Sequence, residues 1–141
     1  MTEKYTMIDF RNVVHKRAAP PNCDSTLQIE AVYAEQGESK GIWQVDDQFL
    51  NGIGVAMGGF LTSAADIMMA YAIATKLDEQ QSFASIDIHT TFHRPVKTGQ
   101  VLVSAKVERI GKKVAYVVAE LVQNDKTVAS AVSSIMILEN E

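Results

Sequence analysis

The chain has 141 residues, 47% of them hydrophobic, so we predict a single domain over residues 1–141 that buries its own core. Its net charge of −4 and the lack of a basic stripe with interleaved aromatic residues argue against nucleic-acid binding. No apolar run approaches the ~18 residues of a membrane span, so we expect neither a nucleic acid nor a membrane as partner. The single cysteine, Cys23, and the lack of a charged-then-apolar leader predict a reducing, cytoplasmic location.

The N-terminal part of the chain is predicted to contain a helix, a loop and a strand pair. Apolar and charged residues over 8–16 have a spacing compatible with a short amphipathic helix. The proline-containing stretch 17–25 indicates a loop, so residues 1–25 form an N-terminal helix and loop. Two strands follow over residues 27–35 and 41–45, joined by a polar turn.

Residues 51–66, NGIGVAMGGFLTSAAD, place a glycine-rich turn before a long helix that we predict over residues 59–77. Gly58 and Gly59 have no Cβ, so other groups can approach the main chain closely. The first N–H groups of a helix have no partner inside it, and they offer donors and a partial positive charge to an oxygen that becomes negative. This arrangement predicts an oxyanion hole.

The helix carries one carboxylate, Asp66, and is otherwise apolar on nearly all sides, which predicts burial of most of its surface. A lone aspartate is costly to bury unless it is paired, hydrogen-bonded or functional. At ~1.5 Å of rise per residue, Asp66 lies on the order of 12 Å from Gly58 and cannot easily serve its own helix N-terminus. Two chains with these helices antiparallel about a two-fold axis would bring each aspartate near the other glycine turn. We therefore predict a homodimer with shared sites.

Four strand-like runs fill the rest of the chain and predict a β-meander. They span residues 82–94, 101–109, 112–123 and 126–138 and are separated by proline, glycine and Asn-Asp breaks. Together with one long apolar helix and a shorter strand pair before it, they predict an α+β fold in which a curved antiparallel sheet wraps a central helix.

The chain resembles the hotdog-fold acyl-CoA thioesterases, in the branch of the 4-hydroxybenzoyl-CoA thioesterase-like superfamily that includes the phenylacetate-pathway enzymes. The stretches SIDIHTTFHRPVKTGQ and VERIGKKVAYVVAEL resemble the strand, turn and hairpin of the family. The resemblance covers the chain from about residue 27 onward and implies a hotdog fold and hydrolysis of an acyl-CoA thioester to a carboxylic acid and free coenzyme A. The most specific match is the pattern N-x-x-G-x-x-[H/M]-G-G followed by A-D in the helix, present here as Asn51, Gly54, Met57, Gly58, Gly59, Ala65 and Asp66.

The resemblance implies catalytic roles for five residues, each with a structural alternative. Asp66 would attack the thioester carbonyl or activate a water as general base; alternatively it is a hydrogen-bonded aspartate in a dimer interface. The N–H groups of Gly58 and Gly59 would stabilise the oxyanion, although glycines at such junctions also serve steric needs. Asn51 would orient the reacting water or acyl group, although Asn-Gly also forms turns. Ser85 would offer a hydroxyl across the dimer, although a strand serine is more often a surface residue.

Met57 departs from the commoner family pattern, which has histidine before the two glycines. Methionine has no N–H to donate to a thioester oxygen, so that role is left to the backbone donors. Its flexible thioether also suits the lining of an acyl pocket, for which we predict Met57, Phe60, Met68, Met69 and Tyr71.

Basic residues are predicted to bind the phosphates of coenzyme A. Arg94 has the planar fork that suits phosphate, and Lys112 and Lys113 lie in the hairpin where relatives bind the nucleotide, although hairpin charges are usually only solvated. His89 and His93 point to one face of their strand, and no cysteine or acidic cluster completes a metal site beside them. We therefore predict no metal and no cofactor, since coenzyme A is part of the substrate.

Two other functions are alternatives on this fold. Hydratases and dehydratases of enoyl or hydroxyacyl thioesters need a histidine paired with a carboxylate at the helix and turn, and Met57 stands where a suitable histidine would be. A non-catalytic acyl-CoA binding or sensing module is favoured by Met57 and opposed by Asp66. We expect the homodimer to assemble as a dimer of dimers, while the sequence leaves its arrangement and the acyl group open.

Overall fold

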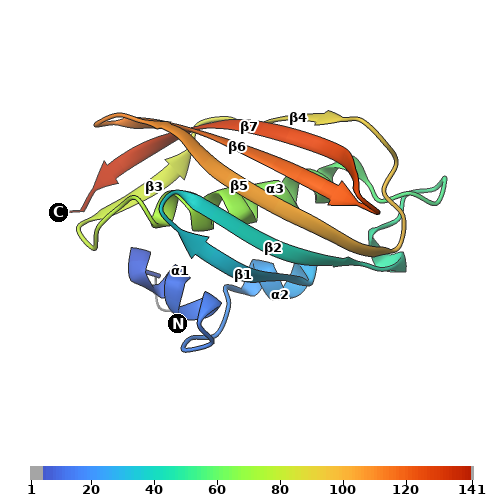
Figure 1. The fold of residues 1–141 in the computed structure, drawn as a ribbon, viewed down its shortest axis with the longest axis horizontal. Helices are drawn as coiled ribbons and strands as arrows, with labels where there is room; N and C mark the ends of the chain where they lie inside the picture. The colour runs from blue at the N-terminus through green and yellow to red at the C-terminus, as the bar shows by residue number, and fades with distance from the viewer. Residues whose placement is uncertain (1–4, 141) are drawn as a thin grey trace.

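The computed structural model describes residues 5–140 and shows one curved sheet wrapped around one long helix, α3 (Gly58–Ala74) (Figure 1). The short helices α1 (Met7–Val14) and α2 (Asn22–Leu27) lie beside β1, outside the sheet. The sheet is antiparallel with the order β1-β2-β5-β6-β7-β3, and β4 also pairs with β7. This is the predicted α+β architecture. The strands are β1 (Ile29–Glu35), β2 (Glu38–Val45), β3 (Gln81–Ser85), β4 (His89–Phe92), β5 (Gly99–Ile110), β6 (Val114–Gln123) and β7 (Lys126–Glu139).

Strands β5, β6 and β7 form a meander as predicted, but the run at residues 82–94 does not lie next to β5. It is split into β3 and β4, which both pair with β7 at the far edge, so the prediction of a four-stranded meander is wrong. At the break, Asp87 Oδ1 accepts a hydrogen bond from the N–H of Ser134 at 2.9 Å, and Ser133 Oγ donates to the Asp87 carbonyl oxygen at 2.7 Å. The outer edge of β3 and β4 has no strand partner among residues 5–140.

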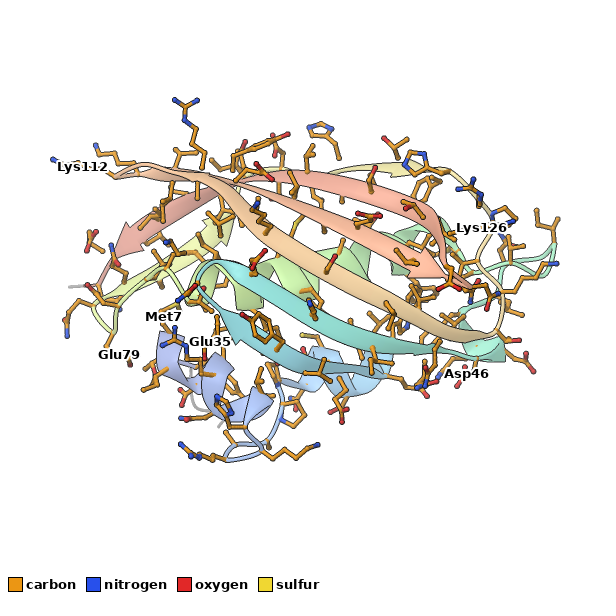
Figure 2. All side chains as sticks on the ribbon, in the orientation of Figure 1. Met7, Glu35, Asp46, Glu79, Lys112 and Lys126 are labelled. Carbon is orange, nitrogen blue, oxygen red and sulfur yellow. The ribbon has the colours of Figure 1, made fainter. Side chains whose placement is uncertain are left out.

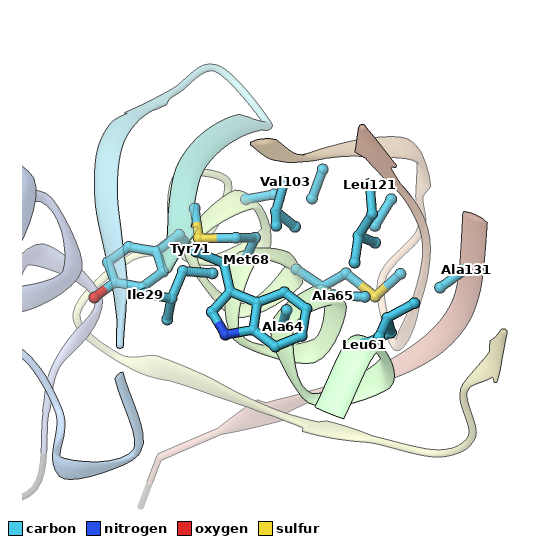
Figure 3. Close-up of a cluster of buried hydrophobic side chains, with 14 of the residues drawn as sticks. Ile29, Leu61, Ala64, Ala65, Met68, Tyr71, Val103, Leu121 and Ala131 are labelled. Carbon is cyan, nitrogen blue, oxygen red and sulfur yellow. The ribbon is translucent and has the colours of Figure 1, made fainter. Parts of the chain in front are cut away.

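The core lies between α3 and the concave face of the sheet (Figure 3). Leu61, Ala64 and Met68 of α3 are at most 2% exposed, and the alanines on this helix let the strands approach closely. The tightest approach is at Gly41 of β2, where a Cβ would lie 2.6 Å from Met68 Sδ. Ser39 Oγ donates to the Met68 carbonyl oxygen at 2.6 Å, which fixes the helix against β2.

The N-terminal segment is more helical than predicted. Helix α1 confirms the expected amphipathic helix, but α2 begins within the stretch 17–25 that was predicted as a loop. The buried Asp24 of α2 accepts a hydrogen bond of 2.5 Å from the hydroxyl of Tyr71 on α3. This contact stabilises a helix of six residues, which local sequence alone would not hold. Burial raises the pKa of Asp24 despite the hydrogen bonds from Tyr71 and Cys23.

The remaining differences concern boundaries. Helix α3 begins one residue earlier and ends three residues sooner than predicted. Strand β2 begins at Glu38, because Gln36 and Gly37 form a two-residue turn with φ of 51° and 80°. No helix within residues 5–140 has the length and apolar character needed to cross a membrane.

Candidate active site

The glycine-rich segment forms a closed loop that leads into the N-terminus of α3. Asn51 Oδ1 accepts hydrogen bonds from the N–H groups of Ile53 and Val55 at 3.0 and 3.3 Å. The N–H of Met57 donates to the carbonyl oxygen of Phe49 at 2.9 Å, so both sides of the loop are fixed. The Asn51 side chain thus stabilises the turn, which is one of the two roles considered for it from the sequence. Ile53, at the tip of the loop, is 85% exposed.

Helix α3 begins with two free hydrogen-bond donors. Gly58 and Gly59 are its first residues, and neither N–H has an acceptor among residues 5–140. Met57 at the N-cap makes no side-chain hydrogen bond to them, and the first turn has no acidic residue. The helix macrodipole adds partial positive charge at this point. The N-terminus of α3 therefore has the donors and the electrostatic field of an oxyanion hole.

Asp66 lies on the exposed face of α3, in line with the small residues Gly59 and Ser63. Its carboxylate has no hydrogen bond or ion pair within residues 5–140, so the hydrogen-bonded alternative is not realised inside one protomer. Although the residue reaches solvent in the single protomer, the surrounding protein excludes enough water to raise the pKa of Asp66 above its ordinary value. An unpaired carboxylate with a raised pKa is suited to accept a proton.

Strand β4 is tied to the first half of α3 by Thr90 and Thr62, whose hydroxyl oxygens are 2.8 Å apart. Phe92, two residues further along β4, faces the same side and lies over the glycine turn. A Cβ at Gly58 would be 2.8 Å from Cζ of Phe92. Sequence reasoning missed Phe92, and the signal for it was its period-two register with Ile88 and Thr90 on one face of the predicted strand.

Ser85 and Phe60, two further predicted site residues, lie in different surroundings. Ser85 pairs with the buried Ile135, so its position in β3 faces the helix, and its side chain is exposed. Phe60 is half-buried and packs edge-on against Phe49, with ring centroids 5.1 Å apart. Ser85 is therefore at the β3 edge of the sheet, whereas Phe60 packs on the segment that follows β2.

The residues predicted to line the acyl pocket differ in their exposure. Met68, Met69 and Tyr71 are at most 1% exposed and form part of the core of the protomer, so their place in an acyl pocket stays a prediction. Because the sequence of α3 is apolar on nearly all sides, it did not predict which side of the helix faces the sheet. Met57 is 47% exposed, and its Cε lies 3.2 Å from the place of a Cβ on Gly59.

The predicted phosphate-binding cations lie at opposite ends of the sheet. Arg94 lies beside the glycine turn, and its Nη1 donates to the carbonyl oxygen of Thr127 at 2.7 Å. Lys112 and Lys113 lie in the hairpin between β5 and β6, and Figure 2 shows Lys112 at the far end of the molecule from Lys126. The cations of one protomer therefore do not converge on one site.

The two strand histidines are exposed. His89 Nε2 is 3.7 Å from Asp87 Oδ2, and His93 Nε2 is 3.0 Å from Ser130 Oγ. Within the described part of the chain, no three His, Cys, Asp or Glu side chains are arranged to hold a metal ion.

Comparison with known proteins places the chain in a family. A family model described as the thioesterase superfamily matches residues 53–130, which is more than half of the chain. The chain belongs to the thioesterase superfamily. The matched region includes the glycine turn, α3 and the strands from β3 to β6, so family membership rests on the segment that carries the candidate site.

Solved structures and a curated relative agree with this thioesterase assignment. A phenylacetic acid degradation-related protein of Ralstonia eutropha JMP134 is 29% identical with a TM-score of 0.85, over 90% of this chain and 98% of that chain. The PaaI protein of E. coli, from the phenylacetic acid degradation operon, has the same fold, with 24% identity and a TM-score of 0.83 over 96% and 98% of the two chains. PA0474 of Pseudomonas aeruginosa, named an esterase, is 29% identical over 62% of this chain, and the match spans 66% of its own length.

These relatives confirm the predicted hotdog fold. Membership of the thioesterase superfamily supports hydrolysis of thioesters as the general activity. The Asp66 carboxylate and the free N–H groups of α3 lie within the matched region. Hydrolysis of a thioester requires a base and an oxyanion hole, and these groups are candidates for the two roles.

Proposed function

We propose that this thioesterase-superfamily protein hydrolyses acyl-CoA thioesters to a carboxylic acid and free coenzyme A, in sites that two protomers share. The proposal is carried by the unpartnered Asp66 carboxylate on the same helix whose first two N–H groups are free. Within one protomer these parts are on the order of 12 Å apart along α3. That separation is too large for a base and an oxyanion hole acting on one carbonyl group, so the two parts of a site belong to different protomers.

The open edge of the sheet and the open face of α3 support a two-fold arrangement. The edge of β3 and β4 lacks a strand partner among residues 5–140, and the exposed face of α3 consists mostly of small side chains. Pairing two such edges about a two-fold axis would continue the antiparallel sheet and set the two α3 helices antiparallel. Each Asp66 would then face the glycine turn of the other chain, with Ser85 beside it.

The chemistry follows from these groups. Asp66 acts as general base and takes a proton from a water, whose oxygen attacks the thioester carbon. The carbonyl oxygen becomes negative and accepts hydrogen bonds from the N–H groups of Gly58 and Gly59. The C–S bond then breaks, the carbonyl double bond re-forms, and the leaving thiolate takes the proton back from Asp66. The raised pKa of Asp66 makes it a stronger base than an ordinary aspartate.

The distribution of positive charge supports coenzyme A as the acyl carrier. In a two-fold dimer the hairpin end of one protomer would lie near the glycine-turn end of the other, so Lys112 and Lys113 would approach Arg94 of the second chain. Ammonium and guanidinium groups beside apolar surface suit a phosphorylated nucleotide. The hairpin end has a hollow of about 750 Å³, whose lining includes Lys76, Lys112 and Lys113, one acidic residue, Glu139, and the apolar Leu77, Ile110 and Met136.

The first test is release of free thiol from short, medium, long and aryl acyl-CoAs. The wild type should turn over at least one class, and Asp66→Asn should lose about 10²–10⁴-fold in kcat, as expected for removal of a general base. Asp47→Asn is the matched control, because it alters an exposed carboxylate in the short turn before the loop. Retained binding of every acyl-CoA without any wild-type turnover would replace this proposal by a non-catalytic binding module.

A single turnover in heavy-oxygen water tests the general-base role against a nucleophilic one. With enzyme in excess over acyl-CoA, a base mechanism puts the heavy oxygen into the acid in the first turnover. A nucleophilic carboxylate would instead give its own light oxygen to the first product and retain the heavy one. Label found first in Asp66 would therefore refute the general-base role.

We further propose that the homodimer assembles as a dimer of dimers. The outer face of β6 and β7 supports it, because contiguous exposed apolar patches mark association surfaces. Light scattering should give the mass of four chains, and Met136→Glu should give a dimer. A wild-type dimer mass would contradict this assembly. The exposed apolar residues at these neighbouring register positions are Val114, Tyr116, Met136 and Leu138.

A further inference from the structure

One apolar side chain next to the glycine turn has no part in the chemistry or the phosphate contacts described above. Phe92 lies on β4 opposite the buried Ala129, so it faces α3, yet it is 53% exposed. The end of its ring rests against Gly58, with Cζ 2.8 Å and both Cε atoms 3.2 Å from the place where a Cβ would be. An exposed aromatic ring therefore borders one of the two free N–H groups.

The backbone of Phe92 is held in place on both sides. Before it, Thr90 is tied to Thr62 of α3 through hydroxyl oxygens 2.8 Å apart. After it, the N–H of His93 donates to the carbonyl oxygen of Val128 at 2.8 Å. The position of Phe92 relative to the N-terminus of α3 is thus set by fixed strands and not by a free loop.

Met57 borders the other glycine. It is 47% exposed, and its Cε is 3.2 Å from the place of a Cβ on Gly59. Each of the two glycines therefore has one exposed apolar side chain against it, Phe92 at Gly58 and Met57 at Gly59. The hollow beside them has a volume of about 450 Å³, and its lining includes Val55, Ala56, Gly58, Leu61 and Phe92.

We propose that Phe92 determines acyl specificity by excluding acyl groups that branch at the carbon next to the carbonyl, an inference that rests on the proposed function. A carbonyl oxygen that accepts from Gly58 lies about 3 Å from its nitrogen, which brings the first acyl carbon within reach of the Phe92 ring that rests against the same residue. An unbranched methylene passes flat against the ring. A methyl branch on that carbon meets the ring, which must then turn aside, because the backbone of Phe92 is fixed in its strand.

The test compares two isomers, hexanoyl-CoA and 2-methylpentanoyl-CoA. Wild-type kcat/KM should favour the straight chain by about tenfold or more, since pockets discriminate a single misplaced methyl group by about 10–200-fold. Phe92→Ala should bring the ratio close to one by raising kcat/KM for the branched isomer, and Phe92→Tyr, which keeps the ring, should retain the wild-type ratio. Leu102→Ala is the matched control, because Leu102 is an apolar residue of β5 with 55% exposure and is not among the residues around the glycine turn.

The dissociation constants of the two corresponding non-hydrolysable thioether analogues are measured in parallel. If the wild type hydrolyses no acyl-CoA, the proposed function fails and the ratio of these constants decides the inference on its own. Where turnover exists, the kcat/KM ratio decides. A wild-type ratio near one, or a ratio that stays unchanged in Phe92→Ala with an unchanged Tm, would overturn the role of Phe92.

Discussion

Complementation between two inactive variants tests the shared site directly. Asp66→Asn removes the carboxylate, and Gly58→Pro removes the N–H without breaking α3, because proline is favoured at the first position of a helix. Met57 already has φ of −62° and ψ of 136°, the extended conformation that a residue before proline adopts. Each homodimer of these variants has two defective sites and should release thiol at less than about one hundredth of the wild-type rate.

The heterodimer of the two variants distributes the defects unequally. One site combines both defects, while the other joins Asp66 of the Gly58→Pro chain with Gly58 of the Asp66→Asn chain and is intact. A heterodimer purified through two different tags should therefore have about one half of the wild-type activity per dimer.

The same experiment has a reciprocal control, in which a wild-type chain is paired with a chain that carries both substitutions. Every shared site then has one defect, so this heterodimer should be inactive. A site contained within one protomer predicts the opposite pattern, with about one half of the activity in the control and none in the complementing pair. That pattern would refute the two-protomer reasoning even if both residues proved essential.

Gly58→Pro should lower kcat by about 10²–10³-fold, the usual effect of losing one oxyanion donor. Gly58→Ala keeps its N–H and displaces only the exposed ring of Phe92, so its loss of kcat should be far smaller. Equal losses in the two variants would argue against a backbone donor. The kcat/KM profile should have an acidic limb above the ordinary aspartate pKa of about 3.9, because desolvation raises the pKa of Asp66, and a limb at or below that value would contradict the assignment. The folded state holds the Asp66 proton more tightly than the unfolded chain does, so this residue lowers stability as pH rises through its raised pKa. The Tm of Asp66→Asn at neutral pH should therefore be no lower than that of the wild type. A lower Tm would indicate an unseen partner of the carboxylate. Tyr71→Phe should lower the free energy of unfolding in urea by about 1–3 kcal/mol, because the buried Asp24 loses its hydroxyl donor, and an unchanged value would show that water replaces it.

Local chemistry predicted the central helix and indicated the candidate site within it. Two glycines before an apolar run predicted the N-terminus of α3, and the structure begins that helix at Gly58. Asp66 stood out because a carboxylate in an apolar helix requires a reason. The small residues that line the exposed face of α3 could be counted in the sequence, but which face they formed depended on how the sheet wraps around the helix.

Non-local contacts account for what the sequence did not predict. The place of β3 and β4 beside β7 depends on pairing between residues far apart in the chain, such as Gln81 with Glu139 and Phe92 with Ala129, for which no local signal exists. Helix α2 depends on the contact between Asp24 and Tyr71, which a reading of local proline and polar residues cannot detect. Met69 was assigned to the acyl pocket because a helix that is apolar on nearly all sides gives no direction.

The close approach of Gly41 to Met68 connects strand β2 to the helix segment that carries the proposed base. Met68 is fully buried and follows Asp66 by two residues on the same helix, so a side chain at position 41 would press on the segment that carries the carboxylate. Mutational scans that rank residues by distance from substrate would treat Gly41 as neutral. We therefore expect a side chain at position 41 to change turnover without altering any residue of the proposed site, by shifting the helix segment that carries Asp66.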